Sequence, residues 1–483
     1  MGSNLPKKIF FWTLVILFII TSILTIFYTL GYRFNTNRGI FVYSGSVTIS
    51  SNPRSANISV DGEPVARQII SSLNNSYHID GLKPGEHLLE VNYPDFNSWS
   101  KKISINSGLS TEFWNVLLTR KEYQKTFSAI KDIDRIFLVP SKKLGAFTQN
   151  GSQGVSVGVF DLSTMEINMI FSEPGYQYFD NNREENIEWS PQAHRIIIPV
   201  SKDSIQYYLI AGVDIKELFN LNEITGSNNL KKVRWDPDHK NFLYYMDGTN
   251  LYRMTLDHPQ EKTLIAENIA SYDITRNKIY YFQLPGGLVY QRDLEGVNDP
   301  IQITDAPPDD AKNYKIVAYD ETAIALWNRN NKDLYIFNIG EKEQYFRKLA
   351  SDIENFQFSD DGKKLLYWND WEISAYFLRK WDTQPIRSEN EQTDVLRFSQ
   401  KISNVQWEKD YEHVLFTADK KIKVVELDYR GQRNISDVIQ FNGEKTEVVE
   451  NLPSNQLFFT DTNEKGEAGL SVIIFPEKTG LFQ

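Results

Sequence analysis

A five-residue pattern in the sequence matches the nucleophile elbow G-x-S-x-G, which positions a catalytic serine. It is Gly154-Val155-Ser156-Val157-Gly158. The elbow works only at a turn from a strand into a helix, because that turn exposes the serine beside an oxyanion hole. The residues around Ser156 are typical of a strand, and no amphipathic helix follows them. We therefore interpret the match as chance, which removes the serine-hydrolase class of enzyme.

The histidines of the chain give no local support for a metal centre. None forms an H-E-x-x-H or H-x-H pair, so no two imidazoles are placed for one zinc ion. His194, His239 and His413 fall in predicted turns of the repeat described below, and we expect their side chains to be solvated. The chain has no cysteine, which excludes disulfides, thiolate metal sites and cysteine catalysis. We expect no metal and no cofactor.

Two acidic stretches could hold a hard cation such as Ca²⁺. The loop that starts at Asp461 begins like a calcium loop, but Lys465 stands at its fifth position and Val472 at its twelfth, where a bidentate acid is required. We interpret it as a hairpin turn. The loop from Asp305 to Asp310 is also acidic, and a solvated loop is the simpler interpretation.

A cluster of aromatic residues is the strongest candidate for ligand binding. Asn369 and Asp370 are typical of a hairpin turn, so Trp368 and Trp371 flank that turn, and Trp381 follows in a polar stretch. Exposed aromatics near a turn can stack on sugar rings or grip a peptide. Packing inside the fold is the alternative. We propose Trp368, Trp371 and Trp381 as ligand-binding residues, with Trp371 foremost, and we expect no catalytic residue.

The composition narrows the class of protein. The chain has 483 residues, of which 41% are hydrophobic and 24% charged, as in a folded protein. It holds 52 Lys and Arg against 63 Asp and Glu, a net charge of −11. Nucleic-acid binding is a poor candidate, because phosphates are neutralised by clustered basic residues. Aromatic residues reach 13%, which favours β structure.

A hydrophobic run near the N-terminus predicts a transmembrane anchor. It extends from Ile9 to Leu30 (residues 9–30) without a charged side chain, and at 1.5 Å per residue it can cross a hydrocarbon core of about 30 Å. A cleaved signal peptide is the alternative, but its apolar region is usually shorter and ends in small residues, which residues 31–33 do not provide. We therefore expect residues 9–30 to have the lipid bilayer as a partner.

The charges beside this run predict the orientation of a single-pass protein. Lys7 and Lys8 precede the run and two arginines follow it, so the positive-inside bias is slight. Residues 1–8 form a short tail that is easily kept in the cytoplasm. We expect the N-terminus inside, a linker at residues 31–44, and the body outside the cytoplasmic membrane. The side of the membrane stays open at this point.

Residues 45–119 predict a small β-sandwich. Val47 and Ile49, then Ile58 and Val60, alternate with polar residues, which is the period of half-buried strands. A tight hairpin turn is expected at Asp61-Gly62.

The same residues resemble the PEGA domain, a small β-sandwich of prokaryotic surface proteins. The family's namesake Pro-Glu-Gly-Ala differs at its two middle positions here. The matching segments are Pro53-Arg54-Ser55-Ala56, Asp61-Gly62, Pro84-Gly85-Glu86-His87 and Phe96-Asn97-Ser98-Trp99. The resemblance implies an extracytoplasmic, non-catalytic spacer or adhesion module.

Residues 121–483 contain a repeated pattern of an aromatic residue, a polar turn and an apolar strand. The starts lie 38–51 residues apart, which brackets the about 40–50 residues of a four-stranded propeller blade. The four clear copies begin at Trp189, Trp235, Phe358 and Trp407, and the four weaker ones at Leu138, Asp273, Ala318 and Asn451.

The repeat predicts an all-β fold with a β-propeller, because a blade buries its apolar faces only against its neighbours. The clear copies resemble TolB-like repeats, whose phrase is Trp-Ser-Pro-Asp-Gly, and Phe358-Ser-Asp-Asp-Gly comes closest. We expect eight blades, with seven as the alternative. The extended segment 123–129 should close the ring by pairing with residues 470–475.

These observations favour a non-enzymatic, membrane-anchored, extracytoplasmic protein whose propeller binds a protein or a cell-envelope polymer. A structural scaffold of the envelope without a discrete ligand is one alternative. A propeller enzyme acting on a polysaccharide is another, and it would need two carboxylates about 5–10 Å apart in the central channel.

Overall fold

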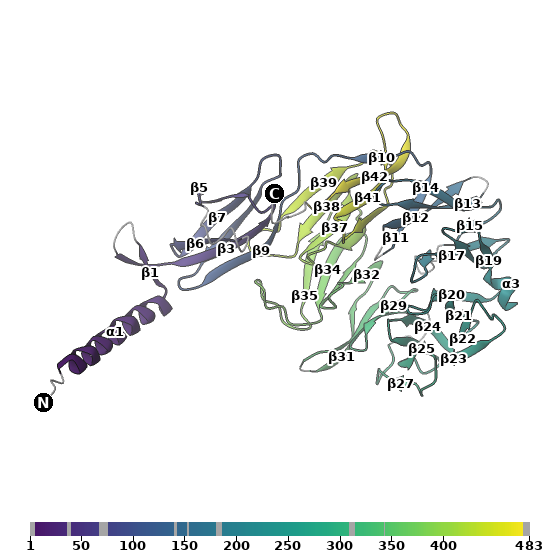
Figure 1. The fold of residues 1–483 in the computed structure, drawn as a ribbon, viewed down its shortest axis with the longest axis horizontal. Coiled ribbons are helices and arrows are strands. Elements are labelled where there is room, and N and C mark those ends of the chain that lie inside the picture. The colour runs from purple at the N-terminus through teal and green to yellow at the C-terminus, as the bar shows by residue number, and fades with distance from the viewer. Residues whose placement is uncertain are drawn as a thin grey trace.

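The chain folds into an N-terminal helix, a small β-domain and a large ring of sheets (Figure 1). The computed structural model describes residues 5–35, 40–66, 76–139, 143–151, 154–179, 186–308, 314–341 and 343–476. Within these residues, the secondary structure after the first helix is β apart from one short helix, α3 (Leu221–Thr225). The small β-domain, called the small domain below, lies between the helix and the ring (Figure 1).

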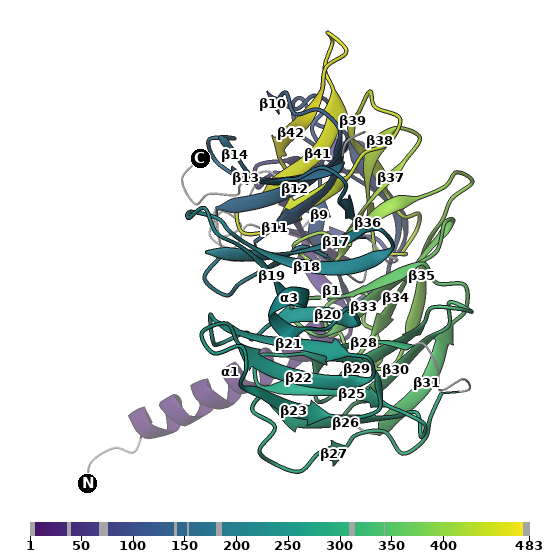
Figure 2. The ribbon, with the colours of Figure 1, turned by 90° about the vertical axis from the view of Figure 1, so that its right-hand side faces the viewer.

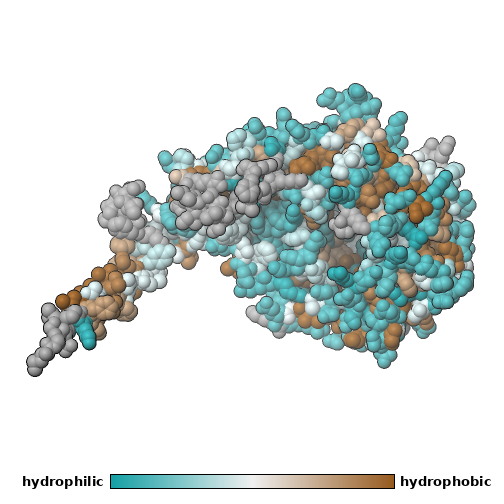
Figure 3. Space-filling view, in the orientation of Figure 1, coloured by the Kyte–Doolittle hydropathy of each residue, from teal (hydrophilic) through white to brown (hydrophobic). Residues whose placement is uncertain are grey.

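The first helix, α1 (Leu5–Thr29), is long and apolar enough to cross a membrane. Its threonines satisfy their hydroxyls on the helix itself: Thr13 Oγ1 donates to Ile9 O and Thr21 Oγ1 to Leu17 O, both at 2.9 Å. None of its apolar window is buried against the rest of the chain, and its surface is mostly hydrophobic (Figure 3). The helix therefore fits a membrane anchor or a signal sequence.

A short hairpin connects α1 to the small domain. Its strands are β1 (Tyr32–Asn35) and β2 (Ile40–Tyr43). Gly31 O accepts a hydrogen bond from Ser44 N, and Ser44 O accepts one from Gly108 N, both at 3.0 Å. Gly31 has φ +89°, and a Cβ there would lie 2.7 Å from the Gly108 nitrogen, so the close approach requires glycine. The end of the helix is thus hydrogen-bonded directly to the small domain.

The small domain is a sandwich of a three-stranded and a four-stranded sheet, with strand orders β6-β3-β9 and β5-β4-β7-β8. β3 runs parallel to β9, and the other pairs are antiparallel. The strands are β3 (Gly45–Asn52), β4 (Asn57–Val60), β5 (Glu63–Pro64), β6 (Ser76–Leu82), β7 (Gly85–Asn92), β8 (Trp99–Ile105) and β9 (Ser110–Leu117). The predicted turn at Asp61-Gly62 is confirmed: it joins β4 to β5 with φ of 52° and 82°.

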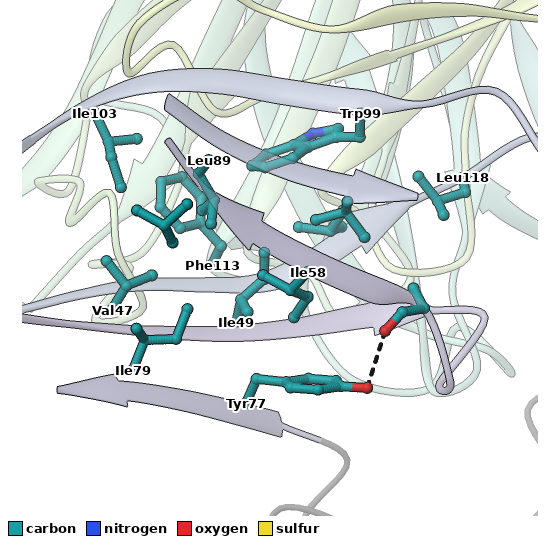
Figure 4. Packing of buried hydrophobic residues seen from close by; sticks show 14 of the residues in the cluster. Val47, Ile49, Ile58, Tyr77, Ile79, Leu89, Trp99, Ile103, Phe113 and Leu118 are labelled. Carbon is teal, nitrogen blue, oxygen red and sulfur yellow. Dashed lines mark hydrogen bonds between the residues drawn. The ribbon is translucent and has the colours of Figure 1, made fainter. Parts of the chain in front are cut away.

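Both sheets of the small domain bury one face against the other (Figure 4). The alternating residues predicted from the sequence form this core, and Tyr77 Oη closes it at one side by donating to Ala56 O at 2.9 Å. The buried side chains include Val47, Ile49, Ile58, Val60, Leu89, Trp99 and Phe113.

The large ring is a β-propeller of eight sheets in the described part of the chain. Figure 2 shows the ring from the side away from the small domain. Blades 1 to 4 are β11 (Ile133–Leu138), β12 (Leu144–Gly151), β13 (Gly154–Asp161) and β14 (Ile167–Ser172); β15 (Gln177–Tyr178), β16 (Glu188–Trp189), β17 (Arg195–Lys202), β18 (Ile205–Gly212) and β19 (Leu218–Asn220); β20 (Leu230–Trp235), β21 (Phe242–Asp247), β22 (Asn250–Thr255) and β23 (Lys262–Ala266); and β24 (Ile269–Ile274), β25 (Lys278–Gln283), β26 (Leu288–Asp293) and β27 (Ile301–Gln302).

Blades 5 to 8 follow the same plan. They are β28 (Tyr314–Asp320), β29 (Ala323–Asn328), β30 (Leu334–Ile339) and β31 (Gln344–Ala350); β32 (Asn355–Phe358), β33 (Lys364–Trp368), β34 (Glu372–Phe377) and β35 (Gln392–Arg397); β36 (Ser403–Trp407), β37 (His413–Ala418), β38 (Lys421–Glu426) and β39 (Ile435–Gln440); and β40 (Val448–Asn451), β41 (Gln456–Thr462), β42 (Ala468–Ile474) and β10 (Thr126–Ser128). The predicted count of eight blades is confirmed.

The blades are held together by apolar packing between neighbours. One buried cluster lies at each junction of the ring, including the junction between blade 8 and blade 1. At that last junction Phe458 and Leu470 of blade 8 pack with Phe147 and Phe160 of blade 1. The ring is therefore closed by the same kind of contact that joins the other blades.

The N-terminal segment of the propeller completes its last blade, as predicted. β10 pairs antiparallel with β42, with Phe127 opposite Ser471. Gly469 makes room for this strand, because a Cβ there would lie 2.3 Å from Ser128 O. Blade 8 is thus built from both ends of the propeller sequence, which fixes the two ends to each other.

The sequence repeat aligns with the blades, but two copies are displaced. A backbone hydrogen bond closes the turn after the first strand in the same way in several blades, for example from Ser359 N to Lys364 O and from Thr275 N to Lys278 O. The fourth copy therefore starts at Ile274 rather than at Asp273.

In blade 8 the displacement of the repeat changes which residue takes its first position. A side-chain oxygen on one blade accepts from a backbone nitrogen on the next at several junctions, for example Glu188 from Trp235 (2.9 Å), Gln357 from Trp407 (3.1 Å) and Gln406 from Glu450 (3.2 Å). The last copy therefore starts at Glu450, not at Asn451 as the alignment indicated. A carboxylate stands there where the four clear copies have an aromatic residue, so the aromatic signal was missing.

Candidate functional site

The three tryptophans proposed as ligand-binding residues all belong to blade 6. Trp368 is the last residue of β33, Trp371 stands in the turn to β34, and Trp381 follows β34. Trp368 is 8% exposed and packs in the core between blades 6 and 7. Trp371 is 48% exposed. The two residues that flank the turn therefore face opposite environments.

Trp381 lies at the other end of the blade. The first residue of β33, Lys364, pairs with the last residue of β34, Phe377, and the Lys364 ammonium stands 3.8 Å from the centre of the Trp381 ring. A lysine at this distance interacts with the ring as a cation–π pair. The structure brings Trp368 and Trp371 to one end of the strands and Trp381 to the opposite end, so the three do not line one surface.

The turn that carries Trp371 is fixed by hydrogen bonds. Asn369 Oδ1 accepts from the backbone nitrogens of Trp371 and Glu372, at 2.9 and 2.8 Å. Trp371 O accepts from Phe398 N at 2.8 Å, which joins the turn to the segment after β35. Asp370 forms an ion pair with Lys401 at 2.8 Å. The exposed indole of Trp371 thus lies on a rigid, hydrogen-bonded turn, beside the ion pair of Asp370 and Lys401.

The polar segment after Trp381, residues 382–391, contacts the small domain. Gln384 Oε1 accepts from Glu112 N at 3.0 Å, and Gln384 Nε2 donates to Ser110 O at 2.9 Å. Both partners lie on β9. Ile386, two residues further, is exposed. The loop therefore acts as a bridge between blade 6 and the small domain.

Blade 7 supplies the buried part of this contact. The Lys101 ammonium is fully enclosed and lies 2.9 Å from Glu426 and 3.5 Å from Asp428. It also donates to the backbone oxygen of Asp428 at 2.8 Å. Trp99 Nε1 donates to the same Glu426 at 3.0 Å. A buried lysine needs this many acceptors, because an unpaired charge in the interior is costly.

Arg430 extends the contact along the loop between β38 and β39. It donates to Glu112 O at 2.7 Å and to Gln384 Oε1 at 3.0 Å. Its guanidinium also stacks 4.1 Å from the centre of the Phe113 ring. Because side chains from both blades and from β9 meet on one guanidinium, the small domain is held at a defined angle to the propeller.

The central channel holds a charged network rather than a free pair of acids. A cavity of about 610 Å³ is lined by the innermost strands of several blades. Arg234 lies 2.5 Å from Glu188 and 3.0 Å from Asp273. Glu188 accepts from Trp235 N and Asp273 from Ala318 N, both at 2.9 Å. Burial raises the pKa of Glu188, and the Arg234 charge opposes that rise.

A second group of ionisable residues lies in the turn after β36. One ligand atom from each of Glu408, Asp410 and His413 lies within 4.8 Å of the other two. His413 Nδ1 is 2.7 Å from Asp410, whose other oxygen accepts from His413 N at 2.9 Å. His413 is 4% exposed, so the expectation of a solvated histidine is wrong. His194 and His239 are partly or fully exposed, as expected.

Glu450 of blade 8 stands beside this group. It is 9% exposed, and within the described part of the chain neither of its carboxylate oxygens has a hydrogen-bond partner. Burial raises the pKa of both Glu450 and Glu408 well above the ordinary value. The charge of Asp410 raises both pKa values further, and the charge of Glu450 also raises the pKa of Glu408. The sequence carried no signal for this group, because its members come from two blades.

Two of the other motifs adopt the structure that the sequence indicated, a strand at Ser156 and a hairpin after Asp461. Ser156 lies in the middle of β13, and its hydroxyl is 2.9 Å from that of Ser172. Asp461 is a buried partner of Lys125 at 2.8 Å. Of the acidic loop at Asp305, residues 309 and 310 lie outside the described part of the structure.

Comparison with protein families confirms the nature of the small domain. Residues 44–120 match the PEGA domain. No curated protein matches the chain.

Solved structures with a similar arrangement include propellers of different kinds. The Dos1 propeller has 11% sequence identity and a TM-score of 0.49, covering 74% of this chain and 96% of that one. Dihydro-heme d1 dehydrogenase NirN has 10% identity and a TM-score of 0.43, covering 65% and 68%. An oligogalacturonate lyase from Vibrio parahaemolyticus has 10% identity and a TM-score of 0.40, covering 74% and 97%. All three scores lie below 0.5, so they add nothing to what the eight sheets already show.

Proposed function

We propose that this chain is a membrane-anchored, extracytoplasmic binding protein without catalytic activity. Its anchor would be residues 9–30, with the short N-terminal tail in the cytoplasm. The small domain would hold the propeller at a fixed angle, and the propeller would bind a protein or a cell-envelope polymer. The observation that carries the proposal is the exposed Trp371, displayed on a rigid turn at the propeller face opposite the small domain.

The position of that face follows from the order of strands in a blade. The small domain contacts the loop between β34 and β35 through Gln384 and the loop between β38 and β39 through Arg430. Both loops connect the third strand of a blade to the fourth. Trp371 stands between the second and third strands, at the other end of the same antiparallel strands. An anchored helix would therefore leave Trp371 on the side turned away from the bilayer.

The continuity of hydrogen bonding supports a presenting role. Gly31, Ser44 and Gly108 join the helix end to the small domain, and Lys101 and Arg430 join the small domain to blade 7. A partner that binds the far face would thus be held at a set distance from the membrane. PEGA domains are extracytoplasmic, which agrees with the N-terminus lying inside.

The channel favours binding over the alternative of a polysaccharide-cleaving enzyme. A glycosidase needs two carboxyl groups free to exchange protons or to attack the sugar. Glu188 and Asp273 are both engaged by Arg234 and by backbone nitrogens. If the enzyme alternative were correct, wild-type protein would release reducing ends from an envelope polysaccharide, and Glu188→Gln would abolish that release.

The test is co-sedimentation of the full chain, held in lipid nanodiscs, with purified peptidoglycan as the cell-wall polymer. Wild type should bind the polymer saturably. Trp371→Ala should weaken the affinity at least about tenfold if the indole is a central contact, because such residues commonly contribute about 2 kcal/mol or more. Tyr429→Ala is the matched control, because Tyr429 is 49% exposed in a loop on the opposite face. Equal loss in both variants would contradict a site at Trp371.

A second arm separates the two kinds of partner. If neither wild type nor variant binds the polymer, a photo-crosslinker placed at the Trp371 turn in intact membranes should capture a protein. No polymer binding and no crosslink at this turn would favour the scaffold alternative over the proposed binding function.

A further inference from the structure

The seam between blades 7 and 8 contains more buried negative charge than its own cations balance. Glu408 is 2% exposed, and its side chain interacts directly with that of Asp410. Two carboxylates this close hold a proton or a cation between them, because like charges at contact distance do not both ionise freely. His413 Nδ1 lies 2.7 Å from Asp410, and the imidazole can bind a metal only in its neutral form, in which it adds no positive charge.

Two lysines near the seam are paired with other carboxylates. Lys364 forms its ion pair with Glu412, and Lys101 forms its own with Glu426. The Lys409 ammonium donates to Asn455 Oδ1 at 3.1 Å. Its charge acts on Glu450, so the three carboxylates of Glu408, Asp410 and Glu450 share one lysine, and two negative charges remain. A divalent cation would balance them.

Glu450 provides an independent indication of a ligand. Its backbone nitrogen bonds to Gln406 in the way that Trp407 N bonds to Gln357 one junction earlier. The Trp407 side chain points into the junction with the preceding blade, where its Nε1 donates to Gln357 O. The equivalent direction takes the Glu450 carboxylate into the seam beside Glu408. Both of its oxygens are free of hydrogen bonds among the described residues, which is unusual for a buried carboxylate.

We infer that Glu408, Asp410, His413 and Glu450 form a binding site for one divalent transition-metal ion, such as Mn²⁺ or Zn²⁺. Two ligands of one ion at about 2.0–2.3 Å lie no more than about 4.6 Å apart. The ligand atoms of Glu408, Asp410 and His413 are within 4.8 Å of one another, so shifts of a few tenths of an ångström place these three on one ion. Glu450, whose carboxylate oxygens have no hydrogen bond among the described residues, would turn toward the ion to join them. Carboxylates with one imidazole suit Mn²⁺ or Zn²⁺ better than the all-oxygen sites typical of Ca²⁺.

The place of the site gives the ion a structural role. Blade 8 is the blade that both ends of the propeller sequence build, and an ion between Glu408 and Glu450 would tie it to blade 7. His413 and Glu412 also line a small cavity shared with Trp99 and Gln384 at the small domain. Asp410 is partly exposed, which leaves a path for the ion. The bound ion would stabilise the ring seam and the contact with the small domain together.

The test uses the full chain in nanodiscs, freed of metal with EDTA and titrated with Mn²⁺ or Zn²⁺ alone by calorimetry. Wild type should bind one equivalent, and Glu450→Gln should weaken the affinity at least about tenfold, since loss of even a supporting group at a metal site costs 10–100-fold. Glu464→Gln, which changes an exposed acid of blade 8, should leave the affinity unchanged. No saturable binding by wild type, or equal binding by wild type and Glu450→Gln, would overturn the site.

A measurement on wild type alone covers the case in which a variant does not fold. Mn²⁺-loaded wild type should show nitrogen coupling from the His413 ring in pulsed electron paramagnetic resonance. A bound Mn²⁺ without any nitrogen coupling would also overturn the assignment, because it would place the ion on surface carboxylates. In that case two buried protons would balance the seam.

Discussion

Lys101 is the fully buried charge at the contact between the small domain and the propeller. Replacing it by methionine keeps the length of the side chain but leaves Glu426 and Asp428 without their enclosed cation. Removing one partner of a buried ion pair typically destabilises by about 3–5 kcal/mol. We expect Lys101→Met to lower the free energy of unfolding by about that amount in chemical denaturation of the full chain.

The neighbouring Lys102 is the natural control for this prediction. It lies on the same strand, β8, with its side chain exposed on the other face. Exposed substitutions commonly change stability by no more than about 0.5 kcal/mol, so Lys102→Met should leave unfolding nearly unchanged. Similar losses in the two variants would show that the interface does not rest on the buried charge.

His87 should make the small domain more stable in mild acid. Burial lowers the pKa of His87, but its hydrogen bonds to Lys83 O (2.7 Å) and Asp61 (2.6 Å) raise it further, so the net pKa lies above 6.5. A raised folded-state pKa gives stability that is complete below the unfolded value and lost as the pH rises through the folded value.

The stability that depends on His87 should therefore be present at pH 5.5 and lost at pH 8.5. We expect His87→Gln to destabilise the chain more at pH 5.5 than at pH 8.5, measured by denaturant unfolding at both values. A difference between wild type and variant that is the same at the two pH values would show that the imidazolium does not contribute.

At the scale of residues, the sequence identified the candidate residues that have a local signature. Trp371 stands beside a turn that Asn369 and Asp370 mark in the sequence, and the structure shows it exposed. Lys101 carried no such signature, because its partner Glu426 lies far along the chain and meets it only once both domains have folded. The same is true of Arg234 and its partners, which come from three different blades.

At the scale of elements, ring closure depends on the fit of β10 against β42. A Cβ on Gly469 would lie 2.3 Å from Ser128 O, and the backbone there cannot move without breaking the pairing. Overpacking of this kind typically costs about 1–3 kcal/mol. We expect Gly469→Ala to destabilise the propeller by that amount and to increase amide hydrogen exchange in β10 and β42.

Gly286→Ala is the matched control for the closure. No atom of the described structure lies within 4 Å of a Cβ at Gly286, and its φ is not positive, so the same substitution should be tolerated there. Unchanged exchange in β10 for Gly469→Ala would mean that the closing strand can shift to accept the methyl group.

The order of elements was predictable because each blade repeats the same local pattern. An aromatic residue, a polar turn and an apolar strand recur, and a blade cannot bury both faces without neighbours. The two copies that were misplaced by one residue, at Ile274 and Glu450, are among the four that lack an aromatic at the first position. In blade 8 the departure from the pattern coincides with the buried carboxylates, and a single sequence cannot distinguish such a departure from simple degeneracy.

At the scale of the whole molecule, the three parts were predictable but their mutual placement was not. The apolar run, the PEGA-like segment and the repeat each have a periodicity of their own. The angle between the small domain and the propeller is instead set by Lys101, Gln384 and Arg430. These side chains lie on loops or on single strand positions, and nothing in their local sequence identifies a partner domain.

That placement is directly measurable because the chain has no cysteine. Cysteines introduced at the exposed Glu86 of the small domain and Asp299 of blade 4 would carry two spin labels without side reactions. If the domains form one rigid unit, double electron–electron resonance on the full chain in nanodiscs should give one narrow distance distribution. A flexible tether would give a broad one.

Arg430→Ala in the doubly labelled chain tests what maintains the angle. It removes the bond to Glu112 O, the bond to Gln384 and the stacking on Phe113, so the distance distribution should broaden. Arg397→Ala removes an exposed guanidinium of blade 6 whose pairing with Glu372 is at the surface, and it should leave the distribution narrow. A broad distribution in unmodified protein would contradict the rigid spacer on which the proposed function depends, since a loosely tethered propeller would not hold Trp371 at a set distance from the membrane.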